Sequence, residues 1–240
     1  MRRRSQSGVT LMELLIAVTL LSLLTVGVMM AMRIGLDAMN KGNDRVLSNR
    51  RITGAHRIIE QQISGLMITM ANCRLGPDAP VIPRPFFQGE PESMRFVSSH
   101  SLQEGARGFP QVLEYQVIPG ERGEGVRLIV NEHLYFGPDA AGRFCTGPAP
   151  GGLGTAFVPI QAGPRSFVLA DQLAFCRFSY LTPVTPQGGP EWVPVWVLPQ
   201  FPRAIRIEME PLEPVPAKVP MLSITMPVRV NRLPGLLYEN

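Results

Sequence analysis

The sequence predicts an α+β protein: one long N-terminal helix, membrane-spanning in its first half, packed on a β-rich domain with mostly antiparallel sheets. Three observations support this fold class. Residues 14–32 carry no formal charge, and residues 33–70 contain no proline and space their apolar side chains as a helix does. After Pro77, prolines and glycines separate short alternating runs that are typical of strands.

The N-terminal stretch predicts a membrane-spanning helix. Three arginines at residues 2–4 precede Gly8, and the run from Val9 to Met32 holds a single charge, Glu13. As a helix this run is about 36 Å long, at about 1.5 Å per residue, which is enough to cross the hydrocarbon core of a bilayer. A secretory signal peptide is the main alternative, but its apolar core would be shorter and would end in an A-x-A-like site. We therefore expect the span to stay in the protein.

Glu13 is unusual because a carboxylate in a spanning helix costs about 2.5–3.5 kcal/mol at the bilayer centre, and less near an end. One interpretation is that it reaches the lipid headgroups, since it lies about one turn from Val9. The other interpretation requires cleavage after Gly8, which would create a new amino group on Val9. Glu13 cannot easily turn onto its own helix terminus, but it can meet the amino group of a neighbouring copy.

The residues GVTLME at positions 8–13, followed by the apolar run, resemble the leader of type IV prepilins and type II secretion pseudopilins. The resemblance implies that a prepilin peptidase cuts after Gly8, that the new amino group of Val9 is methylated, and that Glu13 guides entry into a growing filament. It also implies a type IV pilin-like fold, with the leader in the cytoplasm, the span in the inner-membrane lipid and the remainder in the periplasm. Val9 departs from the family, which most often has phenylalanine there.

The helical pattern continues beyond the span. Apolar residues recur at intervals of three and four from Leu36 to Leu66, and most charged residues fall elsewhere. We predict one helix that ends before the Gly76-Pro77 break, and two helices broken near Gly42 are the alternative. The predicted organisation is a leader over residues 1–8, the membrane half of the helix over 9–32, its periplasmic half over 33–70 and a globular domain over 71–240.

The globular domain is predicted to consist of short strands. Alternating or apolar runs predict strands at residues 94–97, 112–118, 126–136, 167–169, 173–181, 193–198, 204–209 and 222–230. Pro227 within the last run indicates an edge strand or a bulge. Two stretches rich in glycine and proline, residues 136–157 and 182–190, are predicted loops.

A second resemblance lies in the C-terminal half. The strand at residues 172–181, Trp192 and the leucine-proline step within residues 198–207 resemble the J-type minor pseudopilin of type II secretion systems. The resemblance implies a structural role, helping to initiate the pseudopilus at its tip with other minor and major pseudopilins. Because Phe178 and Tyr180 share one strand face that Trp192 can cap, we interpret these aromatic residues as packing and not as a binding site.

The three cysteines would lie outside the cytoplasm, where disulfides persist. They cannot all pair within one chain. Cys176 falls in a predicted strand beside apolar residues, as a buried free thiol would. Cys73 and Cys145 lie by glycine- and proline-rich turns, and we expect these two to pair. A bond between Cys145 and Cys176 is the alternative that the sequence leaves open.

The sequence argues against catalysis, metal binding and nucleic-acid binding. His56, His100 and His133 are not spaced with one another or with cysteines as metal ligands are, and no nucleotide-binding motif is present. The net charge of +4 reduces to 20 basic against 19 acidic residues without the leader, so no basic surface for phosphates is predicted. We expect no enzyme, no metal and no cofactor. Glutamates near turns are interpreted as solvated, with calcium binding as the alternative: Glu90, Glu92, Glu121 and Glu124.

The sequence thus predicts a structural minor pseudopilin of a type II secretion system. A minor pilin of a type IV pilus is one alternative, because it would carry the same leader and use the same assembly mechanism. The other alternative is an anchored periplasmic enzyme or ligand-binding module that uses the helix only as a tether. Its activity would survive removal of the helix, whereas a pseudopilin would lose its role.

Overall fold

The computed structural model describes most of the 240-residue chain: residues 10–74, 76, 78–103, 106–149, 154–184, 188–212 and 222–228. At residues 40–53, 106, 107, 122 and 222 it describes the backbone alone. The chain divides into two compact units, Met1–Arg50 and Arg51–Asn240. The predicted leader, with Gly8, and the predicted new terminus at Val9 lie outside the described residues.

Helix α1 runs from Leu11 to Ser64 without interruption. The long predicted helix is therefore confirmed, and the alternative of two helices broken near Gly42 is wrong. The helix ends earlier than expected, so the predicted helical range 33–70 is too long at its C-terminal end.

The end of α1 is set by Gly65 and not by the later Gly76-Pro77 break. The N–H of Gly65 donates to the carbonyl oxygen of Gln61 at 3.0 Å, and the chain then enters strand β1 (Leu66–Met67). A side chain at Gly65 would place its Cβ 2.8 Å from the Ser98 Oγ atom. Glycine therefore allows the helix end to approach the sheet closely.

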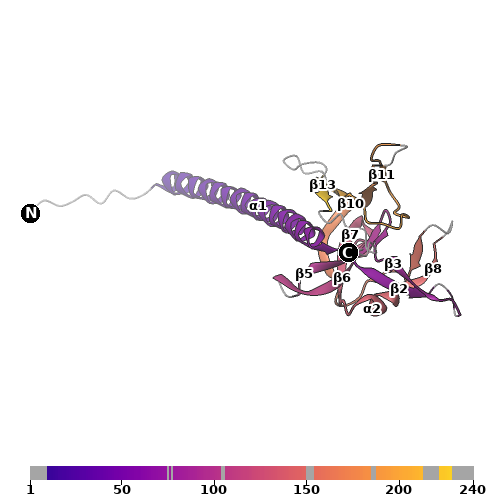
Figure 1. Ribbon diagram of the computed structural model, residues 1–240. Coiled ribbons are helices and arrows are strands. Elements are labelled where there is room, and N and C mark those ends of the chain that lie inside the picture. The colour runs from indigo at the N-terminus through magenta and orange to yellow at the C-terminus, as the bar shows by residue number, and fades with distance from the viewer. Residues whose placement is uncertain are drawn as a thin grey trace, which may run out of the picture. The chain divides into compact units, whose positions relative to one another are not determined.

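The C-terminal unit is built on one antiparallel sheet of nine strands (Figure 1). The main path of the sheet runs β1–β5–β6–β7–β10–β12–β13, with β4 beside β5 and β11 beside β10. These further strands are β4 (Gln88–Gly89), β5 (Ser93–Ser101), β6 (Ala106–Pro119), β7 (Val126–Leu134), β10 (Phe167–Leu181), β11 (Trp192–Val193), β12 (Ala204–Pro211) and β13 (Leu222–Pro227). The predicted α+β class with an antiparallel sheet is confirmed.

Several strand predictions differ from the structure in detail. The runs at 167–169 and 173–181 form one strand, β10, whose pairing with β7 shifts register twice. The predicted strand at 193–198 is reduced to β11 and an isolated bridge between Trp196 and Gly89. Strand β13 lies at the end of the sheet path, so the edge position that Pro227 indicated is confirmed. The strand ends at Pro227, and residues 229–230 of the predicted run lie outside the described residues.

The sequence did not predict the small elements on the sheet. The presumed loop at 136–157 contains helix α2 (Pro138–Gly142) and a two-stranded sheet of β8 (Cys145–Pro148) and β9 (Thr155–Phe157). A second small sheet pairs β2 (Met70–Arg74) with β3 (Val81–Pro85), and a 3-10 helix, η1 (Glu121–Gly123), precedes β7. These segments are only three to five residues long, and several are interrupted by glycine or proline, so they lack a clear period.

The two faces of the sheet carry separate cores. On one face, the last turns of α1 bury Ala55, Ile59 and Ile63 in a cluster with sheet residues such as Phe96 and Leu113. The alternate residues of the same strands, such as Val97 and Val112, join a second cluster with Ala71, Cys73, Phe86 and Ala141. The order is therefore helix, sheet, and a layer of small elements.

A disulfide between Cys73 and Cys145 links two of the small elements, β2 and β8, with their Cα atoms 5.5 Å apart. This is the pair expected from the sequence. Cys176, on β10, is free and buried. Burial raises the pKa of its thiol to about 12.

Gln62 holds the end of α1 on the sheet by polar contacts. Its side chain is fully buried and donates from Nε2 to Glu132 on β7 at 2.9 Å, while its Oε1 atom accepts from the Tyr115 hydroxyl on β6. Its backbone carbonyl accepts from Ser98 Oγ on β5 at 2.7 Å. One helical residue thus bonds three neighbouring strands, and its position on the helix is fixed because every buried polar atom needs a partner.

We expect Gln62→Ala to lower the free energy of unfolding of the full chain by about 1–3 kcal/mol, because it leaves the Tyr115 hydroxyl and one Glu132 oxygen without this partner. Denaturant titration of the purified chain in detergent measures the change. Glu60→Ala, at an exposed position of the same helix turn, is the matched control and should shift the unfolding midpoint little. Equal shifts for the two variants would contradict the proposed anchor.

Candidate functional site

The first turn of α1 is capped by Thr10. The backbone N–H of Glu13 donates to the Thr10 carbonyl at 3.0 Å and lies 3.4 Å from the Thr10 Oγ1 atom. Threonine followed three residues later by glutamate is the capping-box pattern, so Glu13 lies in the first turn, where the helix dipole favours a negative charge. Among the described residues, its carboxylate has no ion-pair or hydrogen-bond partner. Gly8 and Val9 lie outside these residues, so their predicted roles rest on the sequence.

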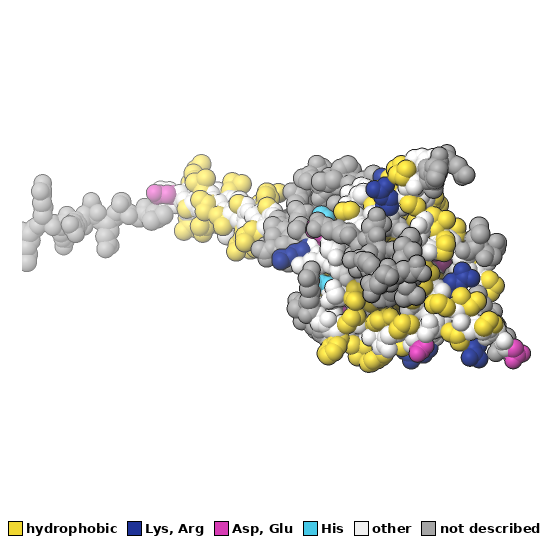
Figure 2. Space-filling view, viewed as in Figure 1, with side chains coloured by type: hydrophobic (Ala, Val, Ile, Leu, Met, Phe, Trp, Pro, Cys, Tyr) yellow, Lys and Arg dark blue, Asp and Glu magenta, His cyan; other side chains and the backbone are white. Residues whose placement is uncertain are grey.

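The N-terminal unit exposes a continuous apolar helix surface. Every large apolar side chain from Leu11 to Met39 is between 52% and 79% exposed, and Figure 2 shows hydrophobic side chains covering the visible face of this helix. The stretch Leu11–Met39 is long and apolar enough to cross a membrane. Its length also exceeds the predicted membrane half, residues 9–32.

The hydroxyl side chains within this stretch are satisfied by the helix itself. Thr19 Oγ1 donates to the carbonyl oxygen of Ile16 at 2.9 Å, and Ser22 Oγ donates to that of Val18 at 2.6 Å. The Thr25 hydroxyl donates to the carbonyl of Leu21 in the same way. These hydroxyls need no water, which is the condition for placing them in lipid or between apolar helices.

The aromatic residues of the second resemblance lie where packing was predicted, with one correction. Phe178 and Tyr180 are buried in the main core. Trp192, however, does not cap their face, because it pairs with Leu181 in register and is covered by the Arg206 guanidinium, 3.9 Å from its ring. Trp196 caps the face instead, with its ring 6.4 Å from that of Tyr180.

A buried ionic cluster lies on the other face of the sheet and was missed by sequence reasoning. Arg95 on β5 donates from Nε to Glu114 on β6 at 2.8 Å, and their side chains are only 1% and 7% exposed. The second Glu114 oxygen contacts His133 at 3.1 Å and Asn131 at 3.3 Å, both on β7. The pairing of β5, β6 and β7 brings these side chains together, and no local pattern in the sequence reveals that register.

The layer of small elements closes over this cluster. The Arg95 guanidinium lies 5.0 Å from the ring centre of Phe144 and 5.6 Å from that of Phe157, and it donates to the Val158 carbonyl at 2.8 Å. Burial alone would raise the pKa of the Glu114 carboxyl. The hydrogen bond from His133 and the charge of Arg95 outweigh burial and lower this pKa to about 2. The cluster joins β5, β6 and β7 through a buried pair of opposite charges.

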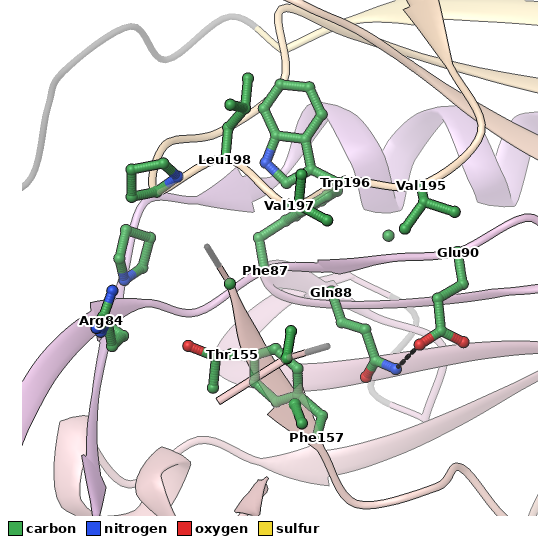
Figure 3. A pocket seen from close by; sticks show the side chains of 16 residues that line it. Arg84, Phe87, Gln88, Glu90, Thr155, Phe157, Val195, Trp196, Val197 and Leu198 are labelled. Carbon is green, nitrogen blue, oxygen red and sulfur yellow. Dashed lines mark hydrogen bonds between the residues drawn. The ribbon is translucent and has the colours of Figure 1, made fainter. Parts of the chain in front are cut away.

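A groove of about 320 Å³ lies beside this layer (Figure 3). Trp196, with its neighbours in the segment 195–198, forms one wall, and Thr155 and Phe157 on β9 form the other, with Arg84 and Glu90 at opposite ends. Its lining is largely apolar. The Glu90 carboxylate accepts hydrogen bonds from Gln88 at 2.9 Å and from Ser93 at 2.6 Å, so each of its two oxygen atoms already has a partner within the protein.

The clustered glutamates do not form a metal site in the described parts of the chain. No group of three or more histidine, cysteine, aspartate or glutamate side chains is placed there to hold an ion. Glu121 pairs instead with Arg127 at 2.9 Å, and its side chain is 80% exposed. Calcium binding, left open by the sequence, therefore has no support from this geometry.

Because the pKa of Glu114 is lower in the folded chain than its ordinary value of 4.5, its ionised form stabilises the fold. This contribution is fully present above about pH 5 and is lost as the pH falls toward 2. We expect Glu114→Gln to be less stable at neutral pH and to show a flatter decline in stability between pH 5 and 2. Denaturant titrations at several pH values measure both effects. Glu121→Gln is the control, and a decline as steep in Glu114→Gln as in the wild type would refute the assignment.

Comparison with known proteins adds to this geometry. Residues 3–29 match a family model described as the prokaryotic N-terminal methylation motif, and this range includes Gly8, Val9 and Glu13. No curated protein matches the chain significantly. The matched motif is a prepilin-type cleavage and methylation signal that extends into the apolar helix, and an antiparallel sheet follows that helix. This arrangement is consistent with a type IV pilin-like α+β fold, and the motif implies processing by a prepilin peptidase.

Proposed function

We propose that this chain is a minor pseudopilin of a type II secretion system, most similar to the J type, which assembles at the pseudopilus tip and helps to initiate it. The observation that carries the proposal is the processing motif at residues 3–29, which extends into an apolar helix whose large apolar side chains are each more than half exposed. Prepilin peptidase cuts between Gly8 and Val9, and Val9 is then N-methylated. Other minor and major pseudopilins are its partners. Pilin-like proteins are generally structural, and we propose no reaction and no cofactor for this chain.

The exposed helix supports assembly because its apolar surface must always be covered. In the membrane, lipid covers the stretch Leu11–Met39. Once the helix leaves lipid, water would contact side chains that are each more than half exposed. The hydrophobic effect then favours packing against other apolar helices, and such packing is the defining contact of a pilin-type filament.

Glu13 supports a specific register in that packing. Its carboxylate has no partner among the described residues, and an unpaired charge between apolar helices is costly. Cleavage creates a new N-terminal amino group in each neighbouring subunit, at the position that Val9 has here. This amino group would neutralise the charge. Helix offsets that do not bring the two groups together leave the charge unpaired, so they are penalised. Before assembly, the polar lipid headgroups can solvate the same carboxylate.

The orientation and the subclass are parts of the same proposal. Residues 1–8 lie in the cytoplasm, the helix crosses the inner membrane, and the sheet with its Cys73–Cys145 disulfide lies in the periplasm, where disulfides persist. The J-type assignment is supported by the strand at 172–181 and by the leucine-proline step before β12. A minor pilin of a type IV pilus fits the same motif, and the partners that co-purify with the chain distinguish the two.

The mature terminus tests the processing step. We expect mass spectrometry of the chain from native membranes to find an N-terminal peptide that begins with N-methylated Val9. Substituting Gly8→Ala should leave residues 1–8 attached, because cleavage depends on the glycine. A native chain that still carries its leader would refute the proposal.

The assembly role of Glu13 has its own test. We expect Glu13→Gln to leave leader cleavage and folding intact but to reduce incorporation into filaments at least tenfold, because the neutral amide cannot pair with a terminal amine. Shearing, sedimentation and immunoblotting measure incorporation beside wild-type partners. Asp37→Asn removes an exposed charge further along the same helix and serves as the matched control. Unchanged incorporation of Glu13→Gln would exclude the charge-pairing role.

A further inference from the structure

An exposed apolar patch lies at one end of the β6–β7 pair. It consists of Phe109, Leu134 and Phe136, whose side chains are 74%, 47% and 73% exposed. Two phenylalanines exposed to this extent side by side are unusual on the surface of a protein that works alone. We call these three residues the hairpin patch.

The strand register places the hairpin patch on the face of the sheet that carries α1. Gln111 pairs with Leu134, and the Tyr135 N–H donates to the Pro110 carbonyl at 2.9 Å, so the pairing continues toward Phe109 and Phe136. Side chains two residues apart on a strand share a face. Leu134 therefore lies on the same face as Glu132, the residue that Gln62 of α1 contacts.

The spacing of the hairpin patch suits a second helix beside α1. Along β7, Leu134 and Phe136 are roughly 7 and 13 Å from Glu132, at about 3.3 Å per residue. Packed helices lie about 8–10 Å apart. These two distances from the Glu132 contact bracket the usual spacing of packed helices, so a second helix on this face can reach Leu134 and Phe136, and also Phe109 on the neighbouring strand β6.

The chemistry of the hairpin patch selects an apolar occupant. It carries no charge, and Glu132, two residues before Leu134 on the same strand face, is already engaged by Gln62, by Ser101 Oγ at 2.8 Å and by the Leu102 N–H at 2.7 Å. Pilin-type chains all carry an apolar helix that must be covered outside lipid, as the stretch Leu11–Met39 does here. The hairpin patch is continuous with the face of the sheet against which α1 of this chain already packs.

We propose that the hairpin patch binds the apolar N-terminal helix of a neighbouring pilin-like subunit, alongside α1 on the same face of the sheet. This inference rests on the assembly role proposed above and identifies the surface that receives the neighbour. The contact is heterologous, since a helix on one subunit meets a sheet on the next, and such contacts generate helical filaments.

Photo-cross-linking of the full chain in its native membranes tests the proposal. Benzoylphenylalanine replaces Phe109 or Phe136, and the control position is Val81, an exposed apolar residue on β3. We expect cross-linked product from positions 109 and 136 to exceed that from 81 at least tenfold, and mass spectrometry should locate the bond in the apolar helix of another subunit. The Glu13→Gln variant, for which we expect reduced incorporation into filaments, should lose most of these cross-links.

The two proposals fail in different ways. Cross-links from processed, sedimenting filaments that fall only on lipid or on the sheet of a neighbour overturn the role of the hairpin patch and leave the assembly role standing. An absence of cross-links from such filaments also overturns it. A chain that keeps its leader and never sediments with filaments overturns the assembly role itself.

Discussion

The constraint on which the rest of this protein depends is an apolar helix that the chain itself does not cover. The stretch Leu11–Met39 exposes every one of its large apolar side chains and satisfies its own hydroxyl groups. Burial of apolar area is the main favourable contribution to protein association, so such a surface has only two stable environments, lipid and other helices. In the function proposed above, assembly moves the helix from the first environment to the second.

The C-terminal end of the same helix, by contrast, is covered, and the C-terminal unit must hold it in one place. Apolar contacts from Ala55, Ile59 and Ile63 supply attraction but little positional specificity. Gln62 adds that specificity through hydrogen bonds to three strands. On the far face, the Arg95–Glu114 pair and the disulfide secure the layer of small elements. Buried polar groups that are fully paired thus fix the geometry that apolar packing leaves loose.

Much of this arrangement could be predicted from residues alone. The charge-free run after Glu13 and the proline-free helical spacing gave α1, and alternating runs gave β5, β6, β7 and β12. The small elements were not predicted, because β2, β3, β8 and β9 are too short to show a clear alternation, although each pairs with a strand nearby in the chain. A different limit hid the Arg95–Glu114 cluster and led to Trp192 in place of Trp196 as the aromatic cap. Strand register decides which side chains meet, and a local pattern does not contain it.

The burial of Cys176 has a consequence for how this fold is reached. Its thiol has a pKa of about 12, so almost none of it is the thiolate that exchanges with a disulfide, and the closed sheet shields it from attack. In the proposed periplasmic location, mispairing is therefore a hazard only while the chain is still unfolded. Because Cys73 and Cys145 precede Cys176 in the chain, vectorial export would present the correct partners to each other first. The order of the three cysteines can thus protect the native connectivity during biogenesis, before any tertiary structure exists to do so.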